Sequence, residues 1–201
     1  MQTFNNEVYT SVMSSVDVQE EFLSIISDVK DDLTTVLRLH LLCEIQLEAY
    51  ICASVDREHF FTKPMTLSVT YNVKNKMALN LGLLEDAHSA FDVINKIRNK
   101  FSHSISKKEI TADDVERFYN KVKKLDSSPI HPDEMSFTVG NLEYRVNSKA
   151  TPNRIKLAIL YFCLSISACA QELDNTEAQE RTENTESSSD KKNITISFSR
   201  K

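Results

Sequence analysis

Apolar residues recur along most of this chain every three or four positions, which is the spacing of amphipathic helices and not the alternation of strands. The stretch 31–55 is apolar on most sides, so we expect it to form a central, buried helix. The same periodicity predicts helices over about residues 16–29, 66–81, 85–103, 111–125 and 153–173. The chain is therefore predicted to be all-α, folding as a single antiparallel bundle of about five to six helices.

Three segments do not follow this periodicity. Residues 1–15 are largely polar and are expected to be a flexible lead-in to one helical domain at 16–173. Residues 135–147 contain a short alternation of apolar side chains around Gly140, which predicts a small hairpin or an irregular loop. Residues 174–201 are mainly Glu, Asn, Thr, Ser and Gln, so a disordered, acidic tail is expected there.

The helix that ends near His103 carries the only constellation in the sequence that offers chemistry as well as packing. Its apolar arc consists of Ala87, Ala90, Phe91, Ile94, Ile97 and Phe101. Arg98 falls inside this arc, whereas Asn99 and His103 lie on the polar side, one turn apart. A guanidinium is always charged, and burying an unpaired charge is costly, so Arg98 needs a partner. The central helix places Glu44 in an apolar face, one turn after His40, and we expect Glu44 to pair with Arg98.

The composition and charge exclude several classes of function. A formal net charge of −5 and a pI near 5.6 argue against a general polyanion binder. The two glycines are far apart, so no phosphate-cradling loop is present. Four single cysteines lie in apolar helical stretches, which predicts buried thiols and not a metal site. We therefore expect neither a cofactor nor a metal ion.

The sequence also predicts where the protein acts. No basic, apolar signal sequence opens the chain. Its most apolar stretch, 157–170, is shorter than the roughly 20 residues that a membrane span needs. A cytoplasmic location without membrane contact is expected.

The string Arg98-Asn99-Lys100-Phe101-Ser102-His103, late on a helix of a small helical domain, resembles the signature of the HEPN (higher eukaryotes and prokaryotes nucleotide-binding) superfamily. The likeness extends more loosely over residues 33–119. Within the superfamily the layout is also similar to the mannitol-repressor-like proteins. This resemblance implies a metal-independent endoribonuclease, commonly a toxin or an antiviral defence effector, whose active site is completed across a homodimer.

The resemblance implies a role for each residue of the motif. His103 is the general base or general acid of RNA cleavage, Arg98 holds the scissile phosphate, and Asn99 orients the histidine or donates to the phosphate. We expect His40 and Glu44 to support the site. Arg98 and His103 lie about 140° apart around an ideal helix, so the motif needs a distorted helix end or a second copy of the chain. A basic run beside the motif is expected to contact RNA and includes Lys96, Lys100, Lys107 and Lys108.

Alternatives stay open at this point. Arg98 can be a structural ion-pair partner of Glu44, His103 a helix-end histidine that suits the helix dipole, and His40 a satisfied core histidine. The lysines can form an ordinary solvated face. The alternative function is a non-enzymatic, mannitol-repressor-like regulatory module that acts through protein contacts, with an antitoxin or another protein as partner. A third hypothesis makes the domain part of a larger defence system, with the tail from position 174 binding a basic partner.

Overall fold

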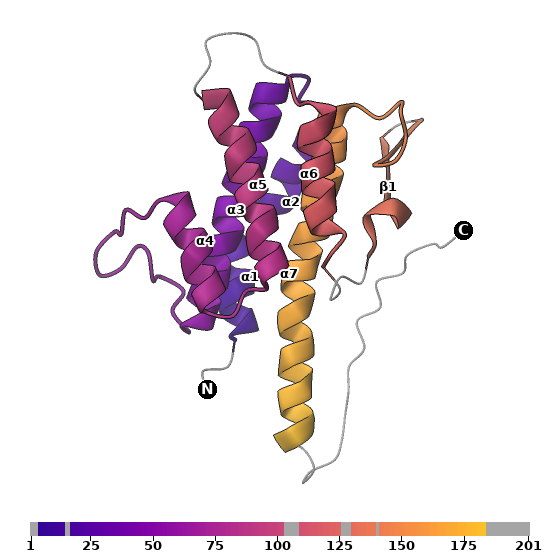
Figure 1. The fold of residues 1–201 in the computed structure, drawn as a ribbon. Coiled ribbons are helices and arrows are strands. Elements are labelled where there is room, and N and C mark those ends of the chain that lie inside the picture. Colours follow the sequence, from indigo (N-terminus) through magenta and orange to yellow (C-terminus); the bar gives the residue numbers. More distant parts are fainter. Residues whose placement is uncertain (1–3, 15–16, 103–108, 126–129, 140, 184–201) are drawn as a thin grey trace.

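The computed structural model describes residues 4–14, 17–102, 109–125, 130–139 and 141–183, with side chains described as far as Ala168. This part of the chain is predominantly helical, as the periodicity predicts, and includes one small two-stranded sheet (Figure 1). The elements are α1 (Asn6–Ser14), α2 (Val18–Ser27), α3 (Asp32–Ser54), α4 (Tyr71–Asn80), α5 (Glu85–Ser102), α6 (Ala112–Val122), the 3-10 turn η1 (Pro132–Glu134), β1 (Ser136–Val139), β2 (Leu142–Arg145) and α7 (Asn153–Glu183).

α3 is the helix around which the others pack, because it contacts α1, α2, α4, α5 and α7. It begins where the side chain of Asp31 accepts a hydrogen bond from the Thr34 amide, which caps the first turn. Buried side chains occur on most of its circumference, and Leu39, Leu47 and Ile51 are completely enclosed. The residues predicted to form a central helix therefore do form one.

α5 turns its apolar arc toward the core and its polar side away from it. The six residues of that arc are all buried, as predicted: Ala87, Ala90, Phe91, Ile94, Ile97 and Phe101. α4 runs antiparallel to α5, since Tyr71 contacts Phe91 and Asn75 contacts His88. The turn between the two helices contains Gly82 at φ +113°, a conformation that favours glycine. Because α4 and α5 both pack on α3, these three helices carry the candidate site between them.

The segment before α6 is tied to two distant helices. The amide of Ile110 donates to Asp32 Oδ2 at 2.7 Å, and its carbonyl oxygen accepts from Asn153 Nδ2 at 2.8 Å. α6 then begins with a capping box, in which Thr111 and Asp114 exchange side-chain to backbone hydrogen bonds. The first turns of α3, α6 and α7 are therefore held together at Ile110.

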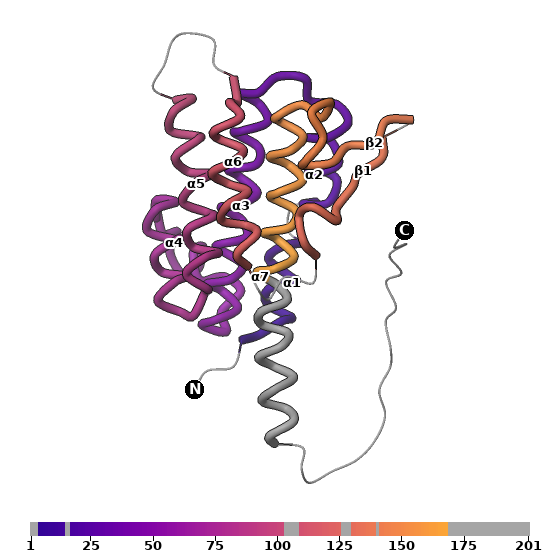
Figure 2. The backbone as a smooth tube through the Cα atoms, turned by 45° about the vertical axis from the view of Figure 1, so that its right-hand side comes forward, coloured from indigo at the N-terminus to yellow at the C-terminus, as the bar shows by residue number. Residues whose placement is uncertain are grey.

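The predicted hairpin is present. β1 and β2 pair antiparallel, with Phe137 opposite Tyr144. The ring of Phe137 lies 5.8 Å from that of Phe22 on α2 and 5.3 Å from that of Phe162 on α7, measured between centroids. These aromatic contacts fix the hairpin against the bundle, beside the upper half of α7 (Figure 2).

α1 corrects the expectation of a flexible lead-in over residues 1–15. The side chain of Asn5 accepts hydrogen bonds from two amides of the first turn and so caps this helix. Tyr9 is buried, and the Phe4 ring lies 5.2 Å from that of Tyr50 on α3. Only a few apolar residues make these contacts, so the periodicity of this short segment is too weak to predict a helix. The cap at Asn5 is the signal that could have revealed it.

α7 is longer than predicted, because its backbone stays helical as far as Glu183, beyond the expected boundary at 173 (Figure 1). The first part of the predicted disordered tail is therefore helical. No glycine or proline occurs between Asn153 and Glu183 to end the helix earlier. The remainder of the predicted tail, 184–201, lies outside the described residues. None of the described helices combines the length and apolar character that crossing a membrane requires.

Candidate functional site

Arg98 lies near the end of α5, with its side chain half-buried. Its Nη1 donates a hydrogen bond to Oδ1 of the adjacent Asn99 at 3.2 Å. Within the described part of the chain, no carboxylate lies within ion-pair distance of the Arg98 guanidinium. Its positive charge is therefore partly shielded from water without being neutralised by an acid of those residues.

The predicted pairing of Glu44 with Arg98 is wrong. Glu44 Oε1 and Glu48 Oε1 each lie 2.5 Å from Nζ of Lys74 on α4. The Lys74 side chain is only 8% exposed, and burial by itself lowers the pKa of its ammonium. The hydrogen bonds that this ammonium donates to Glu44 and Glu48 outweigh burial and raise its pKa above the ordinary value. The helical wheel identifies the face of α3 that carries Glu44, but not which neighbouring helix supplies the cation.

His40 lies on the same face of α3, between α4 and α5. Its Nε2 is 3.3 Å from Oδ1 of Asn95, a distance at which the tautomer protonated at Nε2 donates a hydrogen bond to the amide oxygen. Its ring stacks on that of Tyr71 with a centroid distance of 4.3 Å and an interplanar angle of 27°. Burial lowers the pKa of His40, and the nearby charges of Arg98 and Lys74 lower it further, against the opposing effects of Asn95 and Glu44. His40 is therefore neutral at neutral pH.

Together these residues form one local site, which we call the α3–α5 seam. It consists of His40 from α3 with Asn95, Arg98 and Asn99 from α5. Asn95 is absent from the prediction, although it lies one turn before Asn99 on the same helix and this spacing could have revealed it. Tyr71 is also missed, and it fixes the seam from α4 because its hydroxyl donates to the Phe91 carbonyl oxygen at 3.0 Å.

The structure describes two of the four lysines that are predicted to contact RNA. Lys96 pairs with Asp92 at 2.7 Å, and Lys100 pairs with Asp114 at 2.6 Å. Lys96 is highly exposed, so its ion pair is weak and exchangeable, whereas Lys100 is held by a buried carboxylate at the start of α6. The predicted residues His103, Lys107 and Lys108 lie outside the described residues.

The buried carboxylate of Asp114 is stabilised in its charged form. Burial by itself raises the pKa of Asp114, but hydrogen bonds from Lys100 and Thr111 outweigh burial and lower it below the ordinary value. Asp114 thus fastens the end of α5 to the first turn of α6. Lys100 is for this reason a structural residue as well as a predicted RNA contact.

The cysteines that the structure describes are buried and free, as predicted: Cys43, Cys52 and Cys163. Burial raises the pKa of each thiol, to about 12 for Cys163, so these groups are poor nucleophiles at neutral pH. The described residues contain no group of three or more His, Cys, Asp and Glu side chains arranged to hold a metal ion.

The seam has the chemistry of an anion site with a neutral imidazole beside it. Arg98 offers charged N–H donors, and Asn95 and Asn99, one turn apart on α5, offer amide groups. An oxyanion such as a phosphate matches this set, because a guanidinium can bind two of its oxygens at once. Comparison of the chain with protein-family models, with curated proteins and with solved structures finds no match.

Proposed function

We propose that this chain is a metal-independent endoribonuclease of the HEPN type, acting on RNA as a toxin or an antiviral effector. The observation that supports this most directly is the half-buried Arg98 guanidinium, which has no carboxylate partner among the described residues. A buried or half-buried arginine is normally paired with an anion. Because none of the described residues supplies that anion, a phosphate of the substrate is the natural candidate.

The proposed reaction is a transesterification within the RNA strand. The 2′-hydroxyl oxygen attacks the neighbouring phosphorus, and the bond to the 5′-oxygen breaks. The hydroxyl proton passes to a base and the leaving 5′-oxygen gains a proton, which gives a 2′,3′-cyclic phosphate and a 5′-hydroxyl end. His103 is the proposed proton-transfer group, because an imidazole titrates near neutral pH. Arg98 holds the phosphate, and Asn99 orients the guanidinium through their hydrogen bond.

His40 and Glu44 are proposed to support this site without taking part in the chemistry. Glu44 holds α4 against α3 through Lys74, which positions the wall of the seam. His40 fixes the Asn95 side chain and stays neutral, so it adds no positive charge of its own. Of the two described lysines that are predicted to contact RNA, Lys96 is the more available, since its pairing with Asp92 is exposed.

The proposed assembly is a homodimer formed through α3. Three leucines recur at every fourth position of this helix and are unusually exposed: Leu33 (47%), Leu37 (43%) and Leu41 (53%). We call them the leucine stripe. They share the face of α3 that carries His40 and Glu44, and exposed apolar stripes of this kind are typical of helix–helix interfaces. A twofold axis at the stripe would bring two seams next to each other. The second copy would then supply the residue that one helix alone turns away from Arg98.

RNA cleavage by purified protein tests the proposal. Single-stranded RNA and tRNA are incubated with the chain in EDTA, and the ends of the products are examined for 2′,3′-cyclic phosphate. Arg98→Ala and His103→Ala should each abolish cleavage, whereas Arg57→Ala and His59→Ala, which alter exposed residues of the loop after α3, should cleave like the parent. Cleavage that survives both motif substitutions would contradict the assignment.

The alternative, a mannitol-repressor-like regulatory module, is favoured by the ion pair of Lys100 with the buried Asp114, which occupies one predicted RNA contact. In that case the leucine stripe would bind a different protein, such as an antitoxin or a regulator. RNA would stay intact under all conditions. Purification with bound partners from cells, followed by loss of the partner in Leu37→Lys, would support this alternative.

A further inference from the structure

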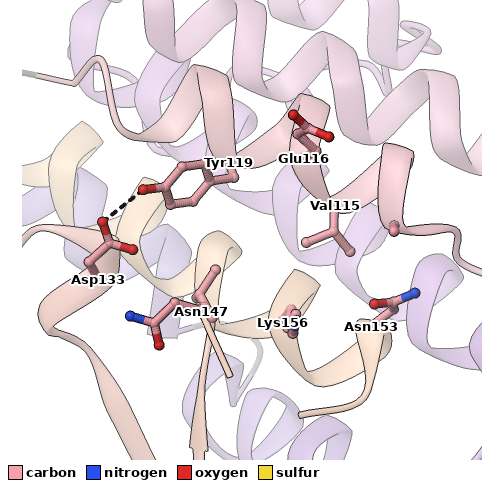
Figure 3. A pocket seen from close by; sticks show the side chains of 9 residues that line it. Val115, Glu116, Tyr119, Asp133, Asn147, Asn153 and Lys156 are labelled. Carbon is pink, nitrogen blue, oxygen red and sulfur yellow. Dashed lines mark hydrogen bonds between the residues drawn. The ribbon is translucent and has the colours of Figure 1, made fainter. Parts of the chain in front are cut away.

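An open cavity of about 360 Å³ lies on the other side of α6 from the seam, bordered by α6, α7, η1 and the residues that follow β2 (Figure 3). Its apolar wall is formed by Val115 of α6 and the buried Val146 that follows β2. This volume is within the range of small-molecule sites, at its lower end. The cavity therefore suits a compact ligand with an apolar part.

Two opposite charges line this cavity from different helices. Glu116 comes from α6 and Lys156 from the first turn of α7. Neither side chain has an ion-pair partner among the described residues. Lys156 is half-buried, so its ammonium gains more from a bound anion than a fully exposed lysine would. The charges thus provide one site for a cationic group and one for an anionic group.

Further acceptors are held in place by contacts within the protein. The Tyr119 hydroxyl donates a hydrogen bond to Asp133 Oδ2 at 2.8 Å. This contact fixes the Asp133 side chain, which is the second carboxylate of the cavity after Glu116. Asn153 uses its amide nitrogen on the Ile110 carbonyl oxygen at 2.8 Å, so its own oxygen is free to accept a hydrogen bond. Figure 3 shows this oxygen turned toward the cavity and the nitrogen turned away. The lining of the cavity is therefore rich in hydrogen-bond acceptors, and Lys156 is the single cation among its described residues.

We propose that this cavity binds a small amphipathic zwitterion, namely a free amino acid or dipeptide with an apolar side chain. The ligand ammonium would lie near Glu116, its carboxylate at Lys156, and its apolar side chain against Val115 and Val146. A polyamine is disfavoured because Lys156 repels it, and a polyphosphate because two carboxylates line the same space. This inference does not depend on RNA cleavage at the seam.

Thermal unfolding and isothermal titration calorimetry of the full chain with L-leucine and leucyl-leucine test the proposal. At least one of these zwitterions should raise the melting temperature, whereas L-leucinamide and N-acetyl-L-leucine, which each lack one charge, should not. Lys156→Met and Glu116→Gln should each weaken binding at least about ten-fold, because each removes a charge-assisted hydrogen bond.

Matched controls alter exposed residues outside the cavity. Lys149→Met and Glu134→Gln remove the same charges nearby and should bind like the parent. Unfolding of each variant without ligand checks that the fold is retained. The proposal is overturned if neither zwitterion binds, if the capped compounds bind as well as the zwitterion, or if the control substitutions weaken binding as much as Lys156→Met.

Discussion

Nζ of Lys74 lies 2.5 Å from Oε1 of Glu44, and this contact decides what Arg98 is available to do. Glu44 is the acid of the central helix that shares a face with His40 at the seam. Because Glu44 is paired with Lys74, it does not pair with Arg98, and the Arg98 guanidinium can bind another anion. The stability of the three-helix face and the proposed phosphate site therefore depend on different cations.

The first prediction separates these two roles. Arg98→Ala should lower the free energy of unfolding by less than about 1 kcal/mol, because no described carboxylate loses a partner. The same variant should lose RNA cleavage. Urea denaturation followed by circular dichroism measures the first quantity. A loss of about 3 kcal/mol or more would instead identify Arg98 as a structural ion-pair residue.

Lys74→Met should destabilise the fold by about 2 kcal/mol, since it leaves two carboxylates on α3 without their shared cation. The estimate is below that for a fully buried pair because both glutamates are partly exposed. Lys76→Met is the matched control: this lysine is exposed on the same helix, so its loss should change the unfolding free energy by less than about 0.5 kcal/mol. Equal losses in the two variants would contradict the role of Lys74.

His40 should make stability depend on pH. Its folded-state pKa lies below the ordinary value of 6.5, so the unfolded chain binds the proton more readily. Stability is therefore predicted to fall as the pH drops through 6.5, and to stop falling below the folded-state pKa. His40→Gln should flatten this part of the profile in denaturation experiments between pH 5 and 8. An unchanged slope in the variant would show that another group is responsible.

Asp114→Asn should cost about 2 kcal/mol, because it removes the pair with Lys100 and weakens the capping box of α6. The pKa of Asp114 is lowered in the folded state, so its contribution is complete above the ordinary value of 3.8 and is lost as the pH falls through the folded-state pKa. The neighbouring Asp113→Asn breaks only an exposed pair with Arg117 and should cost less than about 0.5 kcal/mol. Denaturation at pH 7 and pH 3 compares the two.

Leu37→Lys should convert the proposed dimer to a monomer, because it places a charge within the leucine stripe. Light scattering coupled to size-exclusion chromatography measures the mass. Leu142→Lys in the hairpin changes a leucine that is even more exposed and should leave the dimer intact. A dimer that survives Leu37→Lys, or a parent protein that is monomeric, would remove α3 as the interface.

The sequence was informative where one periodic pattern decides the outcome. The arc of α5, the central position of α3 and the hairpin all follow from such patterns. Pairwise contacts were less predictable, since α3 packs on both α4 and α5 and only this packing brings Glu44 to Lys74. The roles of His40 and Asn95 depend on the same packing. The assignment of His103 stays a prediction, because it lies outside the described residues.

Ile110 uses both of its backbone polar groups on side chains far away in the sequence. Its hydrogen bonds to Asp32 and Asn153 close loops of 78 and 43 residues. Because loops of this length form only once the surrounding helices have assembled, the Ile110 amide should become accessible only when the whole bundle opens. Hydrogen–deuterium exchange at this one amide would therefore report global unfolding. Its rate would show whether the helices of the domain unfold together.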